Sequence, residues 1–326
     1  MQDQYGREID YVRISITDRC NLRCTYCMPE DGIADYTSHT AILSYEEILR
    51  VAKSLARLGI KKIKLTGGEP LVRLGCADLV RELKAINGIE QVTITTNGVL
   101  LAELAEDLIQ AGIDGINVSL DTVEREIFAQ ITRRDFFDKV MAGIEKVKSL
   151  GYGNLKINCV PIAQFNKSEL VKLAAQAKDY PLSVRINELM PIGLAKEFTA
   201  VSKEDIMAML TEAFGEMTPY EGTLGNGPAE YYSLPDFKGH IGFIGAIHNK
   251  FCGQCNRIRL TSGGFLKLCL NQNKGGDLLP LIRGNTSDEE LTEAMRNIFY
   301  QKPLAHHFYE EDQNDTDSRQ MFQVGG

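Results

Sequence analysis

Six of the eight cysteines in this chain fall into two groups of three, one near each end of the sequence. The first group is Cys20, Cys24 and Cys27, with the spacing C-x3-C-x2-C. Clustered thiolates are soft ligands that suit zinc or an iron–sulfur cluster. A structural zinc ion needs a fourth protein ligand, and none lies near, whereas three thiolates on a four-iron cluster leave one iron open. The first triplet is therefore predicted to hold a catalytic iron–sulfur cluster.

The second group, Cys252, Cys255 and Cys269, spans a predicted β-hairpin that turns at residues 262–264. Strand alternation places Arg257 and Arg259 on the same face as Cys255. Guanidinium groups at such a site suit a phosphate or a guanine-like base, through charge and fork geometry. The spacing alone leaves two interpretations open, because His248 could complete a Cys3His zinc site.

The elements that position these groups alternate between strands and helices through the first two thirds of the chain. Strands are predicted at residues 11–17, 62–66, 91–97, 115–120, 155–160 and 183–189. Helices are predicted from residue 44, where a capping box begins, and at residues 77–86, 100–111, 136–150, 168–177, 202–214 and 287–299. Six such alternations predict a parallel sheet, either a partial (βα)6 barrel or an open doubly wound sheet.

Each predicted strand carries apolar residues on one face and polar residues on the other. If the polar face were packed without water, it would bury polar groups that each cost about 1–3 kcal/mol when they lack a hydrogen-bond partner. A closed barrel would instead be filled with Val, Ile and Leu. We therefore expect a curved sheet with an open polar cavity, lined with positive charge by Arg13, Lys64, Lys156 and Arg185. An antiparallel sheet with a solvated face is the alternative, but the long helical connections disfavour it.

The composition narrows the class of protein. The chain has 326 residues, 44% of them hydrophobic, and a net charge of −8. The apolar fraction excludes long disorder, and the negative charge disfavours nucleic acid and anionic membranes as partners. No run approaches the roughly 18 apolar residues that span a bilayer, and the N-terminus has no apolar signal core. We expect a soluble, cytoplasmic protein of about two domains.

Several motifs carry a resemblance to a known family. The first triplet, with Tyr26 before its last cysteine, resembles the signature of radical S-adenosylmethionine (SAM) enzymes. Thr66-Gly67-Gly68-Glu69-Pro70 resembles the SAM amino-group motif of that superfamily. The chain as a whole is similar to the GTP 3′,8-cyclase family of radical SAM lyases, the first enzymes of molybdenum-cofactor biosynthesis. The matching segments lie at residues 18–30, 65–71, 95–98, 117–122, 186–193, 226–232 and 255–260, with the terminal Gly325-Gly326 pair.

The resemblance implies a radical SAM partial barrel of the TIM-like (βα)6 type over residues 1–220. Residues 221–326 would form an α+β extension with a second 4Fe–4S cluster and a flexible Gly-Gly tail. Cluster ligands would be Cys20, Cys24 and Cys27, then Cys252, Cys255 and Cys269. SAM contacts would be Tyr26, Gly68, Ser119 and Met190. GTP contacts would be Arg13, Lys64, Thr95, Lys156, Arg185, Arg257, Ile258 and Arg259. Arg257, Arg259, Gly325 and Gly326 would also take part in catalysis, the glycines by reaching into the active site.

The implied activity uses a 5′-deoxyadenosyl radical from SAM to remove the 3′ hydrogen of GTP. Attack of the sugar radical on guanine C8 then gives 3′,8-cyclo-7,8-dihydro-GTP. The implied partners are a flavodoxin- or ferredoxin-type reductant, cyclic pyranopterin monophosphate synthase downstream, and a second copy in a homodimer. Two alternatives remain: a radical SAM enzyme with an auxiliary cluster that modifies a peptide, and a non-enzymatic metal-binding or electron-transfer module.

Overall fold

The computed structural model describes residues 1–32, 36–308, 317 and 319–325. The strands of the first two thirds are β1 (Tyr11–Ser15), β2 (Lys62–Thr66), β3 (Gln91–Thr96), β4 (Gly115–Ser119), β5 (Leu155–Cys159) and β6 (Ser183–Asn187). The later strands are β7 (Thr218–Tyr220), β8 (Glu230–Ser233), β9 (His240–Ile244), β10 (Arg257–Leu260), β11 (Phe265–Lys267) and β12 (Gly275–Asp277). Within the described residues they form one open sheet in the order β12-β11-β10-β1-β2-β3-β4-β5-β6-β9-β8-β7.

The parallel (βα)6 arrangement predicted for β1 to β6 is confirmed, and two later strands extend it. β10 pairs in parallel with β1, and β9 pairs in parallel with β6. Antiparallel strands then complete each edge, β11 and β12 beside β10, and β8 and β7 beside β9. Only residues 245–256 connect β9 to β10, so this segment runs from one side of the arc to the other and carries two of the cysteines.

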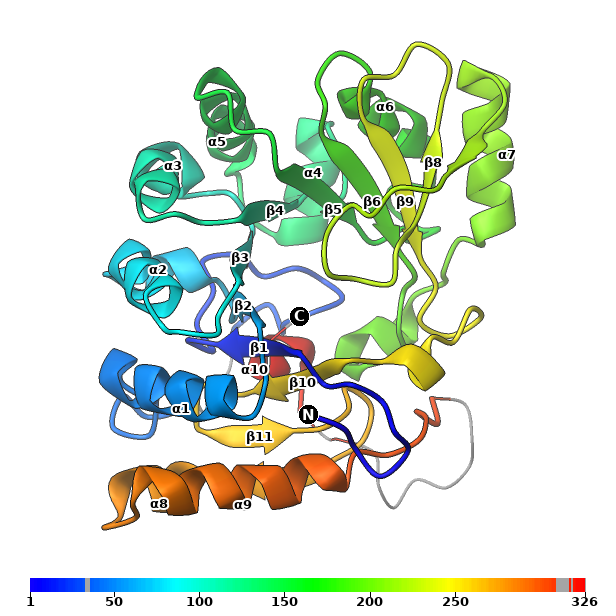
Figure 1. The fold of residues 1–326 in the computed structure, drawn as a ribbon. Coiled ribbons are helices and arrows are strands. Elements are labelled where there is room, and N and C mark those ends of the chain that lie inside the picture. Colours follow the sequence, from blue (N-terminus) through cyan, green and yellow to red (C-terminus); the bar gives the residue numbers. More distant parts are fainter. Residues whose placement is uncertain (33–35, 309–316, 318, 326) are drawn as a thin grey trace.

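The helices are α1 (Tyr45–Arg57), α2 (Cys76–Lys84), α3 (Leu101–Gln110), α4 (Arg125–Thr132), α5 (Phe137–Ser149), α6 (Leu170–Ala174), α7 (Lys203–Phe214), α8 (Leu279–Arg283), α9 (Asp288–Tyr300) and α10 (Met321–Val324). Figure 1 shows the strands as an arc with α1, α2, α3 and α5 on its outer side, and α10 on its inner side. None of the helices in the described part of the chain is long and apolar enough to cross a membrane.

Two predicted helices, one from residue 44 and one over residues 168–177, differ in how well the structure matches them. The capping box at the start of α1 is confirmed: Ser44 accepts from the Glu47 backbone, and the Glu47 carboxylate accepts from the Ser44 N–H. The single helix predicted over residues 168–177 is wrong, because α6 covers only five residues between 3-10 turns at Lys167–Glu169 and Ala175–Ala177.

The core lies between the sheet and its outer helices. The apolar residues that alternate along the strands are buried there, among them Val12, Ile14, Ile63, Leu65 and Val92. Because these side chains point outward to the helices, their polar neighbours in the strands must point to the inside of the arc. The predicted division into an apolar outer face and a polar inner face is thereby confirmed.

Candidate active site

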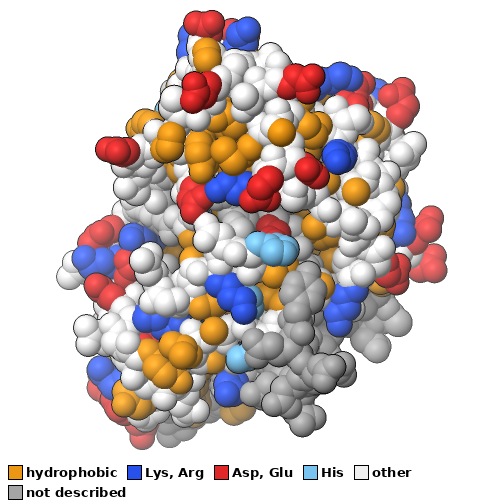
Figure 2. Space-filling view, turned by 90° about the vertical axis from the view of Figure 1, so that its right-hand side faces the viewer, with side chains coloured by type: hydrophobic (Ala, Val, Ile, Leu, Met, Phe, Trp, Pro, Cys, Tyr) orange, Lys and Arg blue, Asp and Glu red, His pale blue; other side chains and the backbone are white. Residues whose placement is uncertain are grey.

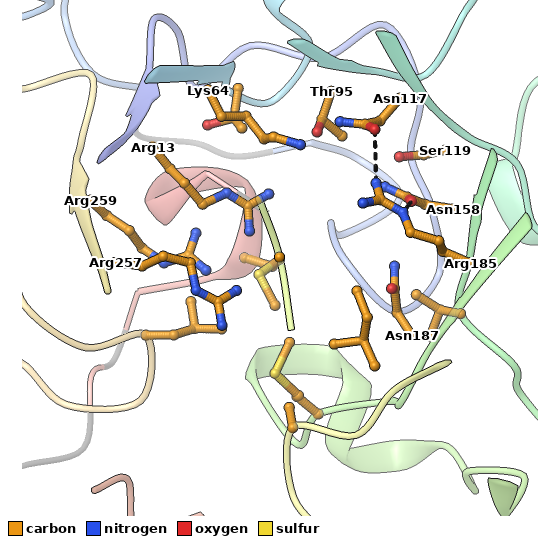
Figure 3. A pocket seen from close by; sticks show the side chains of 18 of the residues that line it. Arg13, Lys64, Thr95, Asn117, Ser119, Asn158, Arg185, Asn187, Arg257 and Arg259 are labelled. Carbon is orange, nitrogen blue, oxygen red and sulfur yellow. Dashed lines mark hydrogen bonds between the residues drawn. The ribbon is translucent and has the colours of Figure 1, made fainter. Parts of the chain in front are cut away.

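The inner face of the sheet lines a cavity of about 490 Å3. Every residue assigned above to a cluster, to SAM or to GTP lies on its wall, whereas Gly325 does not appear in the lining. Figure 3 shows Arg13, Arg257 and Arg259 together on one side of the cavity, Ser119, Asn158 and Arg185 on the other side, and Lys64 and Thr95 between them. The structure therefore brings together the two cysteine triplets, which the sequence separates.

The first triplet follows β1 and lies in a buried, acidic setting. Burial, followed by Glu69, raises the pKa of Cys20 to about 11. Burial, followed by Cys20, raises the pKa of Cys27 to about 12, and burial also raises that of Cys24. Such thiols stay protonated at neutral pH unless a metal replaces the protons. The backbone N–H of Leu22, 3.4 Å from the Cys20 sulfur, and the Asn97 amide are placed to donate to a ligating thiolate.

The Gly-Gly-Glu-Pro motif packs directly against the start of the cysteine loop. A Cβ on Gly67 would lie 2.6 Å from the Thr17 carbonyl oxygen, and one on Gly68 would lie 2.4 Å from the Arg19 carbonyl oxygen. The buried Glu69 carboxylate then accepts from three donors, the backbone N–H groups of residues 71 and 97 and the hydroxyl of residue 96. The glycines therefore allow this turn to tie the cysteine loop to the end of β3.

A half-buried acid–phenol pair lies beside the same triplet. The Tyr26 hydroxyl donates to Asp121 at 2.7 Å, and burial raises the pKa of Asp121 to about 6. Asp121 also accepts from the Val160 backbone, so it fixes Tyr26 relative to β5. Ser119 and Met190 line the adjacent wall, which brings together the four residues that the sequence assigned to SAM.

The cations expected from strand alternation are gathered inside the cavity. Lys64, Lys156, Arg185 and Arg259 are each less than 10% exposed. Within the described residues, no carboxylate forms an ion pair with any of these four side chains or with Arg257. Burial, then Arg185 and Arg13, lowers the pKa of Lys64 well below its usual value. Crowded, desolvated cations of this kind are costly without an anion, so the cavity suits a polyanionic ligand.

Arg185 is held in place by neutral partners. Its guanidinium donates to Asn158 and Asn117, both at 2.8 Å, as Figure 3 shows for the Asn117 bond. These asparagines come from β5 and β4, so the polar faces of three adjacent strands hold one cation without neutralising it. No described residue hydrogen-bonds the buried Thr95 Oγ1 or Asn187 Oδ1, which leaves two further polar atoms for a ligand.

The second triplet lies on the cavity wall opposite β4 and β5. Cys252 and Cys255 come from the segment before β10, and Cys269 follows β11. His248, the alternative zinc ligand, is an exposed residue that pairs with Glu188. No three His, Cys, Asp or Glu side chains in the described part of the chain could hold one metal ion together. A cubane does not require that proximity, because each thiolate binds a different iron.

The end of the chain enters the arc. In α10, Phe322 and Val324 are buried, and the Phe322 backbone N–H hydrogen-bonds Cys27. Gly325 has φ +74°, and Arg259 donates to its carbonyl. A Cβ on Gly325 would lie 2.4 Å from Thr66 Oγ1. The end of the predicted flexible tail is thus packed against the molecule through buried Phe322, Val324 and Gly325, and Gly326 lies outside the described residues.

Several residues of the site escaped the sequence analysis. Asn117 and Asn158 belong to the polar faces, but nothing local indicates that both bind Arg185. Arg7 and Lys302, which contact the backbone of the second triplet, lie outside any periodic pattern. Asp121 follows a strand within the matching segment 117–122. That position is the one feature of the sequence that could have indicated its place in the site.

Comparison with known proteins gives the family. The Radical SAM superfamily model matches residues 14–177, and the Molybdenum Cofactor Synthesis C model matches residues 182–308. Proteins named GTP 3′,8-cyclase from Clostridium perfringens (strain 13 / Type A) and Syntrophomonas wolfei are each 44% identical to this chain, over 100% of both chains.

Solved structures agree on the fold. Streptococcus suis SuiB matches with a TM-score of 0.61 and 13% identity, over 92% of this chain and 68% of that one. Native anSMEcpe with bound AdoMet matches with a TM-score of 0.58 and 19% identity, over 89% and 84%. With its cysteine motif, its cavity and its full-length relatives, the chain belongs to the radical SAM superfamily and, within it, to the GTP 3′,8-cyclase family.

Proposed function

We propose that this chain is a GTP 3′,8-cyclase, which converts GTP into 3′,8-cyclo-7,8-dihydro-GTP in the first step of molybdenum-cofactor biosynthesis. The observation that carries the proposal is one cavity lined by both cysteine triplets and by buried cations that no carboxylate of the described residues pairs with. A nucleoside triphosphate supplies the negative charge that this wall lacks. The relatives that are 44% identical over the full length support the particular reaction.

The substrate would lie along the inner face, with its triphosphate against the cationic side chains. We assign GTP contacts to Arg13, Lys64, Thr95, Lys156, Arg185, Arg257, Ile258 and Arg259. The guanidinium groups of Arg257 and Arg259 can each present two parallel N–H donors to a phosphate or to the guanine edge. Because Asn117 and Asn158 orient Arg185 without neutralising it, its charge remains available to the substrate.

The donor sets fit two 4Fe–4S clusters, one on each triplet, each with an open iron. Bound together, the reduced N-terminal cluster and SAM supply the 5′-deoxyadenosyl radical that removes the 3′ hydrogen of GTP. Cys20, Cys24 and Cys27 would hold the first cluster. The turn at Gly68, the Tyr26 ring fixed by Asp121, and the side chains of Ser119 and Met190 would position SAM beside it.

The chain end would exclude water from the reacting groups. α10 occupies the inside of the arc next to Cys27, and Gly325 lies against the ends of β1 and β2, beside Ser15 and Thr66. Radical chemistry needs a closed site, because exposed intermediates react with solvent species. We assign this closing role to Gly325 and Gly326, with Arg259 as the residue that binds the tail.

Domain limits, partners and location complete the proposal. The partial barrel would cover residues 1–220 and the cluster-bearing extension residues 221–326. A flavodoxin- or ferredoxin-type protein would supply electrons, cyclic pyranopterin monophosphate synthase would take the product, and the enzyme would act as a homodimer. We place it in the cytoplasm, because all eight cysteines are free thiols and cluster ligands need a reducing compartment.

Iron and sulfide analysis of the anaerobically reconstituted chain tests the cofactor assignment. About eight irons and eight sulfides per chain are expected from one cubane per triplet. Replacing Cys252, Cys255 and Cys269 together with alanine should halve both numbers. About four irons with one zinc in the unaltered chain would instead favour a Cys3His site and contradict the second cluster.

Binding of GTP separates this function from peptide modification, the alternative to consider because the fold neighbour SuiB has been solved bound to precursor peptide SuiA. Arg257→Ala and Arg259→Ala should each weaken GTP binding, whereas a peptide-modifying enzyme would bind GTP weakly before and after the change. Isothermal titration of GTP into the reconstituted protein measures this. Failure of the unaltered chain to bind GTP would overturn the substrate assignment.

A further inference from the structure

Lys302 is a buried cation beside the second cysteine triplet. It follows α9 and is 3% exposed. Its ammonium donates to the Arg257 carbonyl at 2.8 Å and to the Leu268 carbonyl at 2.6 Å. These two carbonyls belong to the segments that carry Cys255 and Cys269, so one side chain holds the two segments together.

No carboxylate among the described residues pairs with Lys302. A buried ammonium that meets only carbonyl dipoles is costly, and buried charges are normally matched by an opposite charge. The acidic groups that interact electrostatically with Lys302 are the thiols of Cys255 and Cys269. The counter-charge that this site needs is therefore a set of thiolates, which a bound cluster supplies.

The other cations near the triplet either pair with a carboxylate or face the cavity. Arg7 donates to the Cys252 carbonyl at 2.8 Å, but it is paired with buried Asp3 at 2.7 Å. Lys267 interacts with Cys269 but is paired with buried Asp317. Arg257 and Arg259 face the cavity and would be engaged by substrate. Lys302 also lines the cavity, but among the described residues of this group it alone is buried without a carboxylate partner and is bonded to the backbone on both sides of the triplet.

The two triplets consequently lie in opposite electrostatic settings. Beside the first, the Glu69 carboxylate is buried, and the Asp121 carboxylate accepts from the Tyr26 hydroxyl within the cysteine loop. Beside the second, Arg7 and Lys302 donate to backbone carbonyls of the segments that carry the cysteines. Added negative charge is therefore favoured at the second site and opposed at the first.

We propose that Lys302 raises the reduction potential of the second cluster, and that this potential lies above that of the first cluster. The inference rests on the proposed function, because it requires a cluster on each triplet. Reduction adds negative charge to a cluster, and a nearby buried cation stabilises the more negative state, while nearby carboxylates oppose it. The first cluster is therefore the stronger reductant of the two, and the second holds substrate without competing for the reaction of SAM.

Redox titration followed by electron paramagnetic resonance tests the inference on the reconstituted full-length chain. Lys302→Gln keeps N–H donors for the two carbonyls but removes the charge, and Lys302→Arg keeps both. The unaltered chain should show the second cluster at the higher midpoint potential. Lys302→Gln should lower that midpoint while leaving the first cluster unchanged, and Lys302→Arg should restore it. Variants with Cys20, Cys24 and Cys27 replaced by alanine assign the signals.

Each outcome decides between the possibilities. A second-cluster midpoint in Lys302→Gln equal to that of the unaltered chain, or an equal shift in both clusters, overturns the role of Lys302. If Lys302→Gln loses its second cluster, the midpoint potentials of the unaltered chain still test the proposal. A second-cluster midpoint equal to or lower than that of the first cluster contradicts it. A total of four irons in the unaltered chain overturns the proposed function instead, and iron analysis of the same samples distinguishes that case.

Discussion

At the scale of single residues, the site is defined by cationic side chains that are buried where a stable core would hold apolar ones. Lys64, Lys156, Arg185 and Arg259 are buried on the inner face of the sheet, although burial without an anion is unfavourable for each. Folding alone does not explain them, because the same strands bury Val and Ile on their other face. Binding of an anionic substrate does.

Lys156 gives this account a pH dependence. Burial, assisted by Arg185, lowers the pKa of Lys156 to about 8. The ammonium is charged below that pH and loses its proton above it, so GTP affinity should fall as the pH rises through about 8. Isothermal titration between pH 6.5 and 9.5 measures the profile.

A matched pair of variants isolates this residue. Lys156→Arg should bind GTP with little change above pH 8, because arginine stays charged. Lys156→Met should bind roughly 10- to 100-fold more weakly at pH 7, the value of a lost charge-assisted hydrogen bond. An unchanged pH profile in Lys156→Arg would show that another group titrates.

Alternation of polar and apolar residues made the inner-face residues predictable, because a period of two is a local property of a strand. Arg13, Lys64, Lys156 and Arg185 were identified in this way. Lys302 and Arg7 were not, since they reach the second triplet from segments without a period. The bonds from Arg185 to Asn117 and Asn158 depend on strand register, which no single strand reveals.

At the scale of elements, the turn after β2 controls the cysteine loop. Gly68→Ala would place a Cβ 2.4 Å from the Arg19 carbonyl, a backbone atom next to Cys20 that cannot move independently. We expect loss of SAM binding, measured by equilibrium dialysis of the reconstituted protein. Gly153→Ala is the control, since a Cβ there meets nothing within 4 Å. SAM affinity in Gly68→Ala equal to that of the control would contradict the packing described for this turn.

The chain end offers a second test at this scale. Gly325→Ala introduces a Cβ that lies 2.4 Å from Thr66 Oγ1, at a backbone φ of +74° that side chains disfavour. The tail should leave the cavity, so product formation should fall at least tenfold by the order-of-magnitude cost of strained backbone. Iron content should not change. Full turnover by Gly325→Ala would show that the packed tail has no part in the reaction.

Element boundaries were less predictable than the elements themselves. β3 ends at Thr96 because the Thr96 hydroxyl and the Asn97 side chain accept from backbone N–H groups two residues ahead and form a turn. The pairing of β10 with β1 and of β9 with β6 joins segments far apart in sequence, and local patterns do not encode it. That pairing brings the second triplet to the cavity.

At the scale of the whole molecule, an acidic protein encloses a basic cavity. The net charge is −8, and Figure 2 shows acidic and basic side chains interspersed over the open side of the arc. The unpaired cations lie inside. Global charge does not report where the charges are, so a negative net charge does not exclude a small anionic ligand.

Ligand-dependent thermal stability follows from this distribution. GTP should raise the melting temperature of the chain because it binds only the folded state. At a GTP concentration of 100 times its Kd, the free energy of unfolding should increase by about 2.7 kcal/mol. GDP should stabilise less and guanosine least, since the proposed site places the cations against the phosphates. Differential scanning fluorimetry at equal concentrations gives the order. Equal stabilisation by guanosine and GTP would contradict a phosphate-binding inner face.

The most direct test of the central claim follows the 3′ hydrogen of the substrate. The reconstituted protein is incubated with SAM, a reductant and GTP deuterated at C3′, and the products are analysed by mass spectrometry. We predict deuterium in 5′-deoxyadenosine together with a cyclised nucleotide. Cleavage of SAM at the same rate without GTP, with no deuterium transferred, would contradict the assignment of GTP as substrate.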